Sequence, residues 1–104
     1  MAKKIRDRKY LATYEWRTCM CKRDGVECGA PAIPHHLLRS GEHSMGSKAG
    51  DDHTVPLCAL HHDKLHRGGD EVAFFAHYEW AYNDVKNLTK MLYKNYKNGH
   101  VSWI

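Results

Sequence analysis

The sequence predicts a small α+β domain in which two short strands and a helix, held by metal ions, are flanked by further helices. The chain has 104 residues, so one core buries little apolar surface and benefits from a metal or cross-link. Four cysteines and clustered histidines can supply metal sites. Two short apolar runs precede a helical pattern that a glycine pair ends, which predicts the order strand, loop, strand, helix.

An amphipathic helix is expected over residues 4–17 of the N-terminal segment, which comprises residues 1–17. Its apolar stripe would comprise Ile5, Tyr10, Leu11 and Tyr14. Residues 18–34 are rich in Cys, Gly and Pro, a composition typical of a turn-based metal knuckle.

Two strands are expected at residues 32–38, around an adjacent histidine pair, and at residues 52–57. The connection between them, residues 39–51, contains three glycines and is longer than a tight hairpin needs, which is typical of a functional loop. A helix over residues 59–67 should end at Gly68-Gly69.

Two more helices are expected within residues 70–104. Asp70 can cap the first, and Asn83 or Asp84 can start the second, which Gly99 would end. Most of the large aromatic residues fall here, so we expect these helices to pack over a metal-binding core formed by residues 18–69, in one domain of residues 1–104.

The clustered histidines predict a catalytic metal site. On a helix, His62 and His66 project from one face one turn apart, so both imidazoles can bind one ion. A strand histidine can supply the third ligand. Because adjacent strand residues point to opposite faces, only one of His35 and His36 can easily share that ion, which leaves the other for acid–base chemistry.

The cysteines predict a separate, closed zinc site. The N-terminus has no apolar signal segment, so a reducing cytoplasm is expected and metal ligands are favoured over disulfides. Five residues compete for four ligand positions; in order of preference they are Cys28, Cys58, His61 and Cys19, with Cys21 close behind. An all-cysteine site that leaves His61 free is the alternative.

Two segments, Pro34-His-His36 and Val55-Pro-Leu-Cys-Ala-Leu-His-His-Asp-Lys-Leu-His66, resemble the phage-associated, recombination-enhancement branch of the HNH (ββα-metal) endonucleases. The resemblance covers roughly residues 19–75. It implies a treble-clef-like ββα-metal finger with a structural zinc knuckle. It also implies a phage- or prophage-encoded endonuclease that hydrolyses DNA phosphodiester bonds with little sequence specificity, in recombination, DNA processing or packaging.

The resemblance assigns roles by position. His35, His62 and His66 correspond to ligands of the catalytic ion, and His36 to the general base. The middle motif position, usually an asparagine that braces the metal loop, holds His53 here, which retains a bracing or catalytic role. The implied cofactors are a structural Zn²⁺ and a catalytic divalent ion, which can be Mg²⁺, Mn²⁺, Ni²⁺ or Zn²⁺.

Basic residues indicate a polyanionic partner. The formal charge is +4 with neutral histidines, and DNA in duplex, single-stranded or branched form is the expected substrate. Four residues are candidates for binding DNA phosphates: Arg39, Lys48, Lys64 and Arg67. We expect no membrane segment, a monomer or homodimer, and action in the bacterial host cytoplasm.

Two other functions compete with the nuclease. The first is a zinc-finger module that binds nucleic acid without chemistry; replacement of His36 or His62 would favour it, and both histidines are present. The second is a structural protein whose aromatic C-terminal helices dock on a recombinase or a packaging protein.

Overall fold

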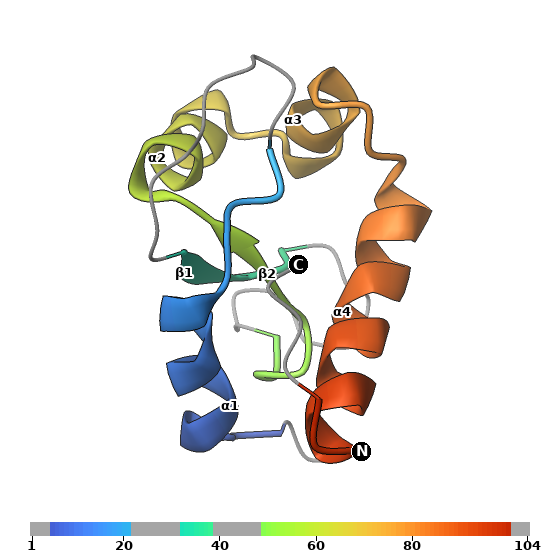
Figure 1. The fold of residues 1–104 in the computed structure, drawn as a ribbon. Helices are drawn as coiled ribbons and strands as arrows, with labels where there is room; N and C mark the ends of the chain where they lie inside the picture. Colours follow the sequence, from blue (N-terminus) through green and yellow to red (C-terminus); the bar gives the residue numbers. More distant parts are fainter. Residues whose placement is uncertain (1–4, 22–31, 39–48, 101–104) are drawn as a thin grey trace.

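The computed structural model describes residues 5–21, 32–38 and 49–100. Its elements, in order, are α1 (Arg8–Ala12), the 3₁₀ helix η1 (Thr13–Trp16), β1 (Ile33–His36), β2 (Thr54–Leu57), α2 (Ala59–Gly68), α3 (Glu71–His77) and α4 (Tyr82–Lys97). The sheet lies centrally, with α1 and α4 on either side and α2 and α3 toward one end (Figure 1). The described chain is therefore α+β, as expected.

The N-terminal helix is shorter than the sequence predicts. It begins at Arg8 because the side chain of Asp7 accepts the Tyr10 amide and caps the first turn, and it tightens into η1 after Ala12. Tyr10 and Tyr14 are buried and pack edge to face, whereas Ile5 stays 38% exposed and does not join the core. The predicted stripe is thus correct only in its tyrosines and the half-buried Leu11.

Both predicted strands are present, each in a shorter form. They pair antiparallel, with His35 opposite Val55 and His36 opposite Thr54. All four residues of β2 are buried, so this strand is covered on both faces, whereas in β1 only His35 is buried. The hydroxyls of Tyr14 and Thr54 lie 2.6 Å apart, which ties η1 to the start of β2.

The ends of α2 and α3 follow the sequence signals. The side chain of Cys58 caps α2, and Gly69 ends it with a φ of +74°, a left-handed conformation that favours glycine. Asp70 then caps α3 through the Ala73 amide at 3.1 Å. Short connections thus place α2 and α3 side by side.

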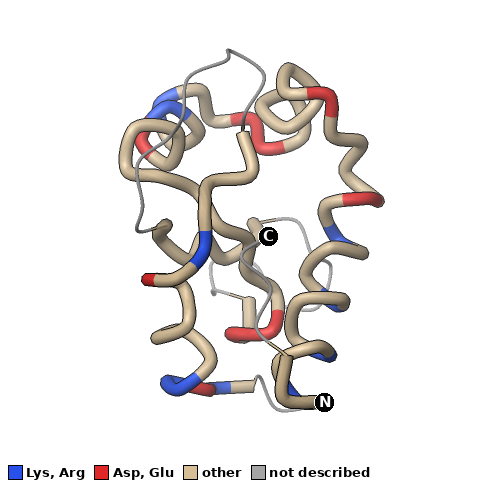
Figure 2. Tube along the Cα trace, in the orientation of Figure 1, with Lys and Arg blue, Asp and Glu red and all other residues tan. Residues whose placement is uncertain are grey.

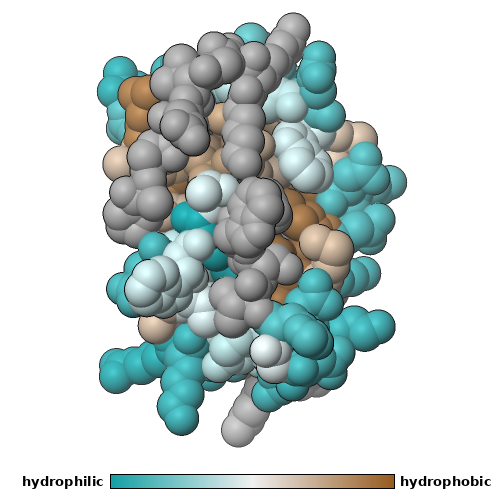
Figure 3. Space-filling model, in the orientation of Figure 1, coloured by the Kyte–Doolittle hydropathy of each residue, from teal (hydrophilic) through white to brown (hydrophobic). Residues whose placement is uncertain are grey.

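The last helix, α4, starts at Tyr82, just before the predicted Asn83, and no side chain caps it. It buries Val85, Leu88 and Leu92 in the core. The surface in Figure 3 has apolar patches in its middle and hydrophilic side chains toward the end where α1 and α4 lie. None of the described helices combines the length and apolar character needed to cross a bilayer.

Candidate metal centres and general base

Three histidines converge from two elements. His35 comes from β1, and His62 and His66 come from α2; one potential ligand atom of each lies within 4.8 Å of the others. The Nε2 atoms of His62 and His66 are 3.1 Å apart. The ring centre of His35 lies 5.3 Å from that of His62 and 5.6 Å from that of His66. The structure thus brings together the three residues that the sequence predicts as one ligand set.

The three-histidine group has the chemistry of a transition-metal site. Burial lowers the pKa of His62, and the neighbouring rings of His35 and His66 lower it further. The neutral imidazole keeps a lone pair that can bind an ion. Three nitrogen donors on a strand and a helix suit a divalent transition ion and leave positions for water or substrate. The residues therefore fit the catalytic ion expected from the sequence.

A buried carboxylate, which sequence reasoning missed, contacts this group. Glu71, in the first turn of α3, is 1% exposed, and its Oε2 lies 2.7 Å from Nε2 of His35. The Leu38 amide and the Tyr82 hydroxyl also donate to it. Burial alone would raise the pKa of Glu71, but the hydrogen bonds from His35, Tyr82 and Leu38 hold it below the ordinary value. An acidic residue after a helix cap is common, so no sequence pattern singles out Glu71.

The neighbouring histidine, His36, has a different partner. Its Nε2 lies 2.9 Å from Oδ1 of Asp51, a carboxylate that is 5% exposed. The Asp7 amide donates to Oδ2 at 2.7 Å, and Arg6 lies 3.9 Å from Oδ1. Burial would raise the pKa of Asp51, but the hydrogen bonds from His36 and Asp7 keep it lowered. With Nε2 engaged, Nδ1 is the nitrogen of His36 left to accept a proton.

The third motif histidine, His53, is not in the converging group of described donors. It is 8% exposed, and its Nε2 lies 3.5 Å from Oδ2 of Asp52. Its backbone carbonyl accepts the Leu37 amide at 2.9 Å, and its amide donates to Gly50. The backbone contacts fasten the segment before β2 to the end of β1 and are available to any residue at this position. The side-chain bracing expected of His53 stays a prediction.

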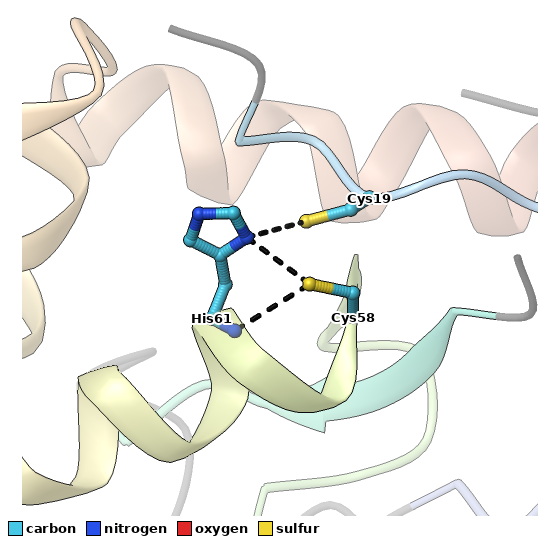
Figure 4. A group of neighbouring side chains, drawn as sticks. All are labelled: Cys19, Cys58 and His61. Atoms are coloured by element: carbon cyan, nitrogen blue, oxygen red, sulfur yellow. Dashed lines mark hydrogen bonds between the residues drawn. The ribbon is translucent and has the colours of Figure 1, made fainter. Parts of the chain in front are cut away.

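A second group of donors joins the segment before β1 to the start of α2 (Figure 4). Nδ1 of His61 lies 3.5 Å from Sγ of Cys19 and 3.1 Å from Sγ of Cys58, and all three residues are buried. Cys21 is buried too, but it is not in this converging set; its amide contacts Sγ of Cys19. Cys28 lies outside the described residues. Of the candidate zinc ligands, the geometry favours Cys19, Cys58 and His61 over the all-cysteine alternative.

The candidate phosphate-binding residues are only partly described. Lys64 and Arg67 are exposed on α2, and Arg67 forms an ion pair with Asp63 one turn earlier. That pair raises the pKa of Arg67. Arg39 and Lys48 lie outside the described residues.

Comparisons with known proteins reach most of the chain. No solved structure matches it. An Escherichia coli protein named "Uncharacterized protein YdfU" is 43% identical over 67 residues, which are 64% of this chain and 17% of that protein. The match thus spans under a fifth of that relative's length. The family described as "Protein of unknown function (DUF968)" matches residues 2–95. The chain therefore belongs to the DUF968 family.

Proposed function

We propose that this protein is a metal-dependent endonuclease of the HNH (ββα-metal) type that hydrolyses DNA phosphodiester bonds. The proposal rests on one observation: two adjacent histidines belong to two different groups of side chains. His35 joins His62 and His66 in a donor set, while His36 pairs with Asp51. Phosphodiester hydrolysis can use a metal ion as Lewis acid together with an oriented imidazole as general base.

In this proposal, His35, His62 and His66 would hold a divalent ion, which would supply Lewis-acid stabilisation of the negative charge that develops during hydrolysis. His36 takes a proton at Nδ1 from the attacking water. The carboxylate of Asp51 fixes the orientation of the imidazole through Nε2 and stabilises the imidazolium that forms. Since the imidazole is only half-buried, substrate and water can reach it.

The cysteine group supports the finer assignment of β1, β2 and α2 as a zinc-stapled finger. A zinc ion on Cys19, Cys58 and His61 would link the segment before β1 to the first turn of α2. His61 precedes His62, so this structural ion would also fix the start of the helix that carries the catalytic ligands. In a domain of this size, such a link adds stability that the apolar core alone does not supply.

The charge distribution supports a polyanionic substrate. Lys and Arg residues lie along α4 and within α2 (Figure 2). Four lysines, Lys86, Lys90, Lys94 and Lys97, follow one another along α4 at spacings of three or four residues, so they share one face. None of them enters an ion pair within the described part of the chain. We therefore assign this row and Lys64 to contacts with DNA phosphates.

The test is cleavage of supercoiled plasmid and of single-stranded DNA after labile metal is removed and Mg²⁺, Mn²⁺ or Ni²⁺ is returned. We expect cleavage to return with metal and to fall about a hundredfold or more in His36→Ala. His62→Ala should lose activity with loss of the ion. His100→Ala, an exposed histidine outside both donor groups, is the matched control and should cut like the parent protein.

Two results would overturn the proposal. Cleavage that persists unchanged in His36→Ala would exclude this residue as the base. DNA binding without cleavage of any substrate, under every metal and with a recombinase present, would instead favour the nucleic-acid-binding module. We include in this proposal a role in recombination or DNA packaging in the host cytoplasm. That role would require the protein to cut DNA.

A further inference from the structure

The buried carboxylate of Glu71 lies outside the finger to which the metal ligands belong. It is contributed by α3, and its partner Tyr82 opens α4. The sequence suggested that these C-terminal helices only pack over the metal site. The contact of Glu71 with His35, which the Tyr82 hydroxyl supports through Glu71, gives both helices a second role.

The contacts of Glu71 determine which nitrogen of His35 carries hydrogen. The Leu38 amide donates to both carboxylate oxygens, at 3.0 and 2.9 Å, and the Tyr82 hydroxyl donates to Oε1. The carboxylate is thus an acceptor in each of these contacts. Nε2 of His35, 2.7 Å from Oε2, must therefore be an N–H donor, which leaves Nδ1 as the nitrogen available to an ion.

We infer that Glu71 is a positioning residue, which fixes the ring and the tautomer of His35 so that Nδ1 joins His62 and His66 in binding the divalent ion. The inference rests on the proposed function for the identity of that site. A carboxylate behind a ligand histidine is a general way to orient the ring and strengthen the nitrogen as a donor. Both His35 and Glu71 are almost fully buried, at 2% and 1% exposed, so water does not compete for the contact.

This arrangement also makes metal affinity depend on α3 and α4. Tyr82 and Leu38 hold Glu71 from two sides, one from α4 and one just after β1. Removal of the Tyr82 hydroxyl alone leaves the His35 contact intact. We therefore expect a graded series in which Tyr82→Phe has a small effect, Glu71→Gln a larger one and Glu71→Ala the largest.

The experiment measures Co²⁺ affinity by visible absorption, on protein whose structural zinc is retained. We expect the Co²⁺ Kd to rise roughly 10-fold in Glu71→Gln and roughly 100-fold in Glu71→Ala. Asp70→Ala is the matched control: it removes the cap of α3 without touching His35, so its Kd should stay within about twofold of the parent value. Equal loss in Asp70→Ala would show that only the stability of α3 matters, and would overturn the inference.

A second readout needs neither metal affinity nor activity. Two-bond ¹H–¹⁵N correlation spectra of the histidine rings, assigned with His35→Gln, report which ring nitrogen of His35 is protonated. We expect hydrogen on Nε2 in the parent protein and a mixture of tautomers in Glu71→Ala. Hydrogen on Nδ1 in the parent, or an unchanged spectrum in the variant, would overturn the inference.

The two proposals fail separately. If the parent protein binds Co²⁺ but cuts no DNA, the nuclease proposal is wrong and the role of Glu71 is unaffected. If Glu71→Ala keeps the parent Co²⁺ affinity and still cuts DNA, the proposed role of Glu71 is wrong and the nuclease proposal is unaffected.

Discussion

His36 and Asp51 are 15 positions apart in the chain, and their side chains meet with 2.9 Å between Nε2 and Oδ1. The same carboxylate accepts the Asp7 amide, and Asp7 in turn accepts the hydroxyl of Tyr93 at 3.0 Å. Burial and the neighbouring Asp7 carboxylate raise the pKa of Tyr93 to about 12, so this hydroxyl remains a donor at neutral pH. The histidine proposed as the base is thus oriented by a hydrogen-bonded series that reaches α1 and α4.

Replacing Asp51 with asparagine should slow DNA cleavage without removing metal. The amide loses the charge that stabilises the imidazolium, so we expect kcat to fall roughly tenfold or more, with parent-like metal content by mass spectrometry. Asp52→Asn is the control, because Asp52 contacts His53 rather than His36. Equal rates in the Asp51→Asn and parent proteins would remove Asp51 from the mechanism.

Asp51 should also contribute to stability in a pH-dependent way. Its pKa is lowered in the folded protein, so its stabilisation is present above the ordinary carboxyl pKa of about 4. The stabilisation is lost as the pH falls through the lower, folded value. The difference in urea unfolding free energy between parent and Asp51→Asn should therefore shrink from pH 7 to pH 3.

The control for this pH series is Asp63→Asn, which breaks an exposed ion pair with Arg67. Such exposed pairs contribute little to stability, so the unfolding free energy of this variant should stay close to the parent value throughout. An Asp51→Asn difference that grows on acidification would contradict the assignment.

The cysteine group makes a prediction about metal content. Cys58→Ser should lose the proposed structural zinc and lower the melting temperature sharply, because Cys58 is both a candidate ligand and the cap of α2. Cys19→Ser should lose the ion as well. Cys21→Ser should keep it, since this thiol lies outside the converging set of described residues. Elemental analysis of zinc in the three variants tests this assignment. Full loss of zinc in Cys21→Ser alone would show that Cys21, and not Cys19, is the ligand.

The lysine row on α4 should govern the salt dependence of DNA binding. Each phosphate contact contributes about 0.9 to the slope of log K against log salt for duplex DNA. Lys90→Gln combined with Lys94→Gln should therefore reduce the slope by roughly 1.8. The kcat at saturating DNA should stay unchanged, because neither residue belongs to the proposed ligand set. Fluorescence anisotropy between low and moderate salt measures the slope, and an unaltered slope would exclude this face.

The sequence predicted the elements better than the contacts between them. Short apolar runs placed β1 and β2 and the helical pattern placed α2 and α3 within a few residues, and the cap signals at Asp70 and Gly69 were correct. The histidine spacing on α2 identified His62 and His66 as one pair, since residues four apart on a helix share a face. Local rules of this kind depend only on neighbours in the chain.

The missed residues depend on long-range contacts. Glu71 reaches His35 across 36 positions and Asp7 reaches Asp51 across 44, and no local pattern marks either acidic residue. The N-terminal helix was predicted too long because the cap at Asp7 competes with further helix before it. The choice between Cys19 and Cys21 also needed the fold, because both thiols are buried and stand two positions apart.

The register of β1 imposes a rule on chain length. His35 lies opposite Val55 and His36 opposite Thr54, and a shift of one residue turns every side chain of a strand to the other face. A single-residue insertion between Ala32 and His35 would turn His35 away from His62 and His66, and His36 away from Asp51. An insertion of two would restore the faces but displace both histidines by about 7 Å along the strand. The length of this segment is therefore constrained in itself: neither an odd nor an even insertion before the histidine pair keeps both contacts, independently of which side chains are inserted.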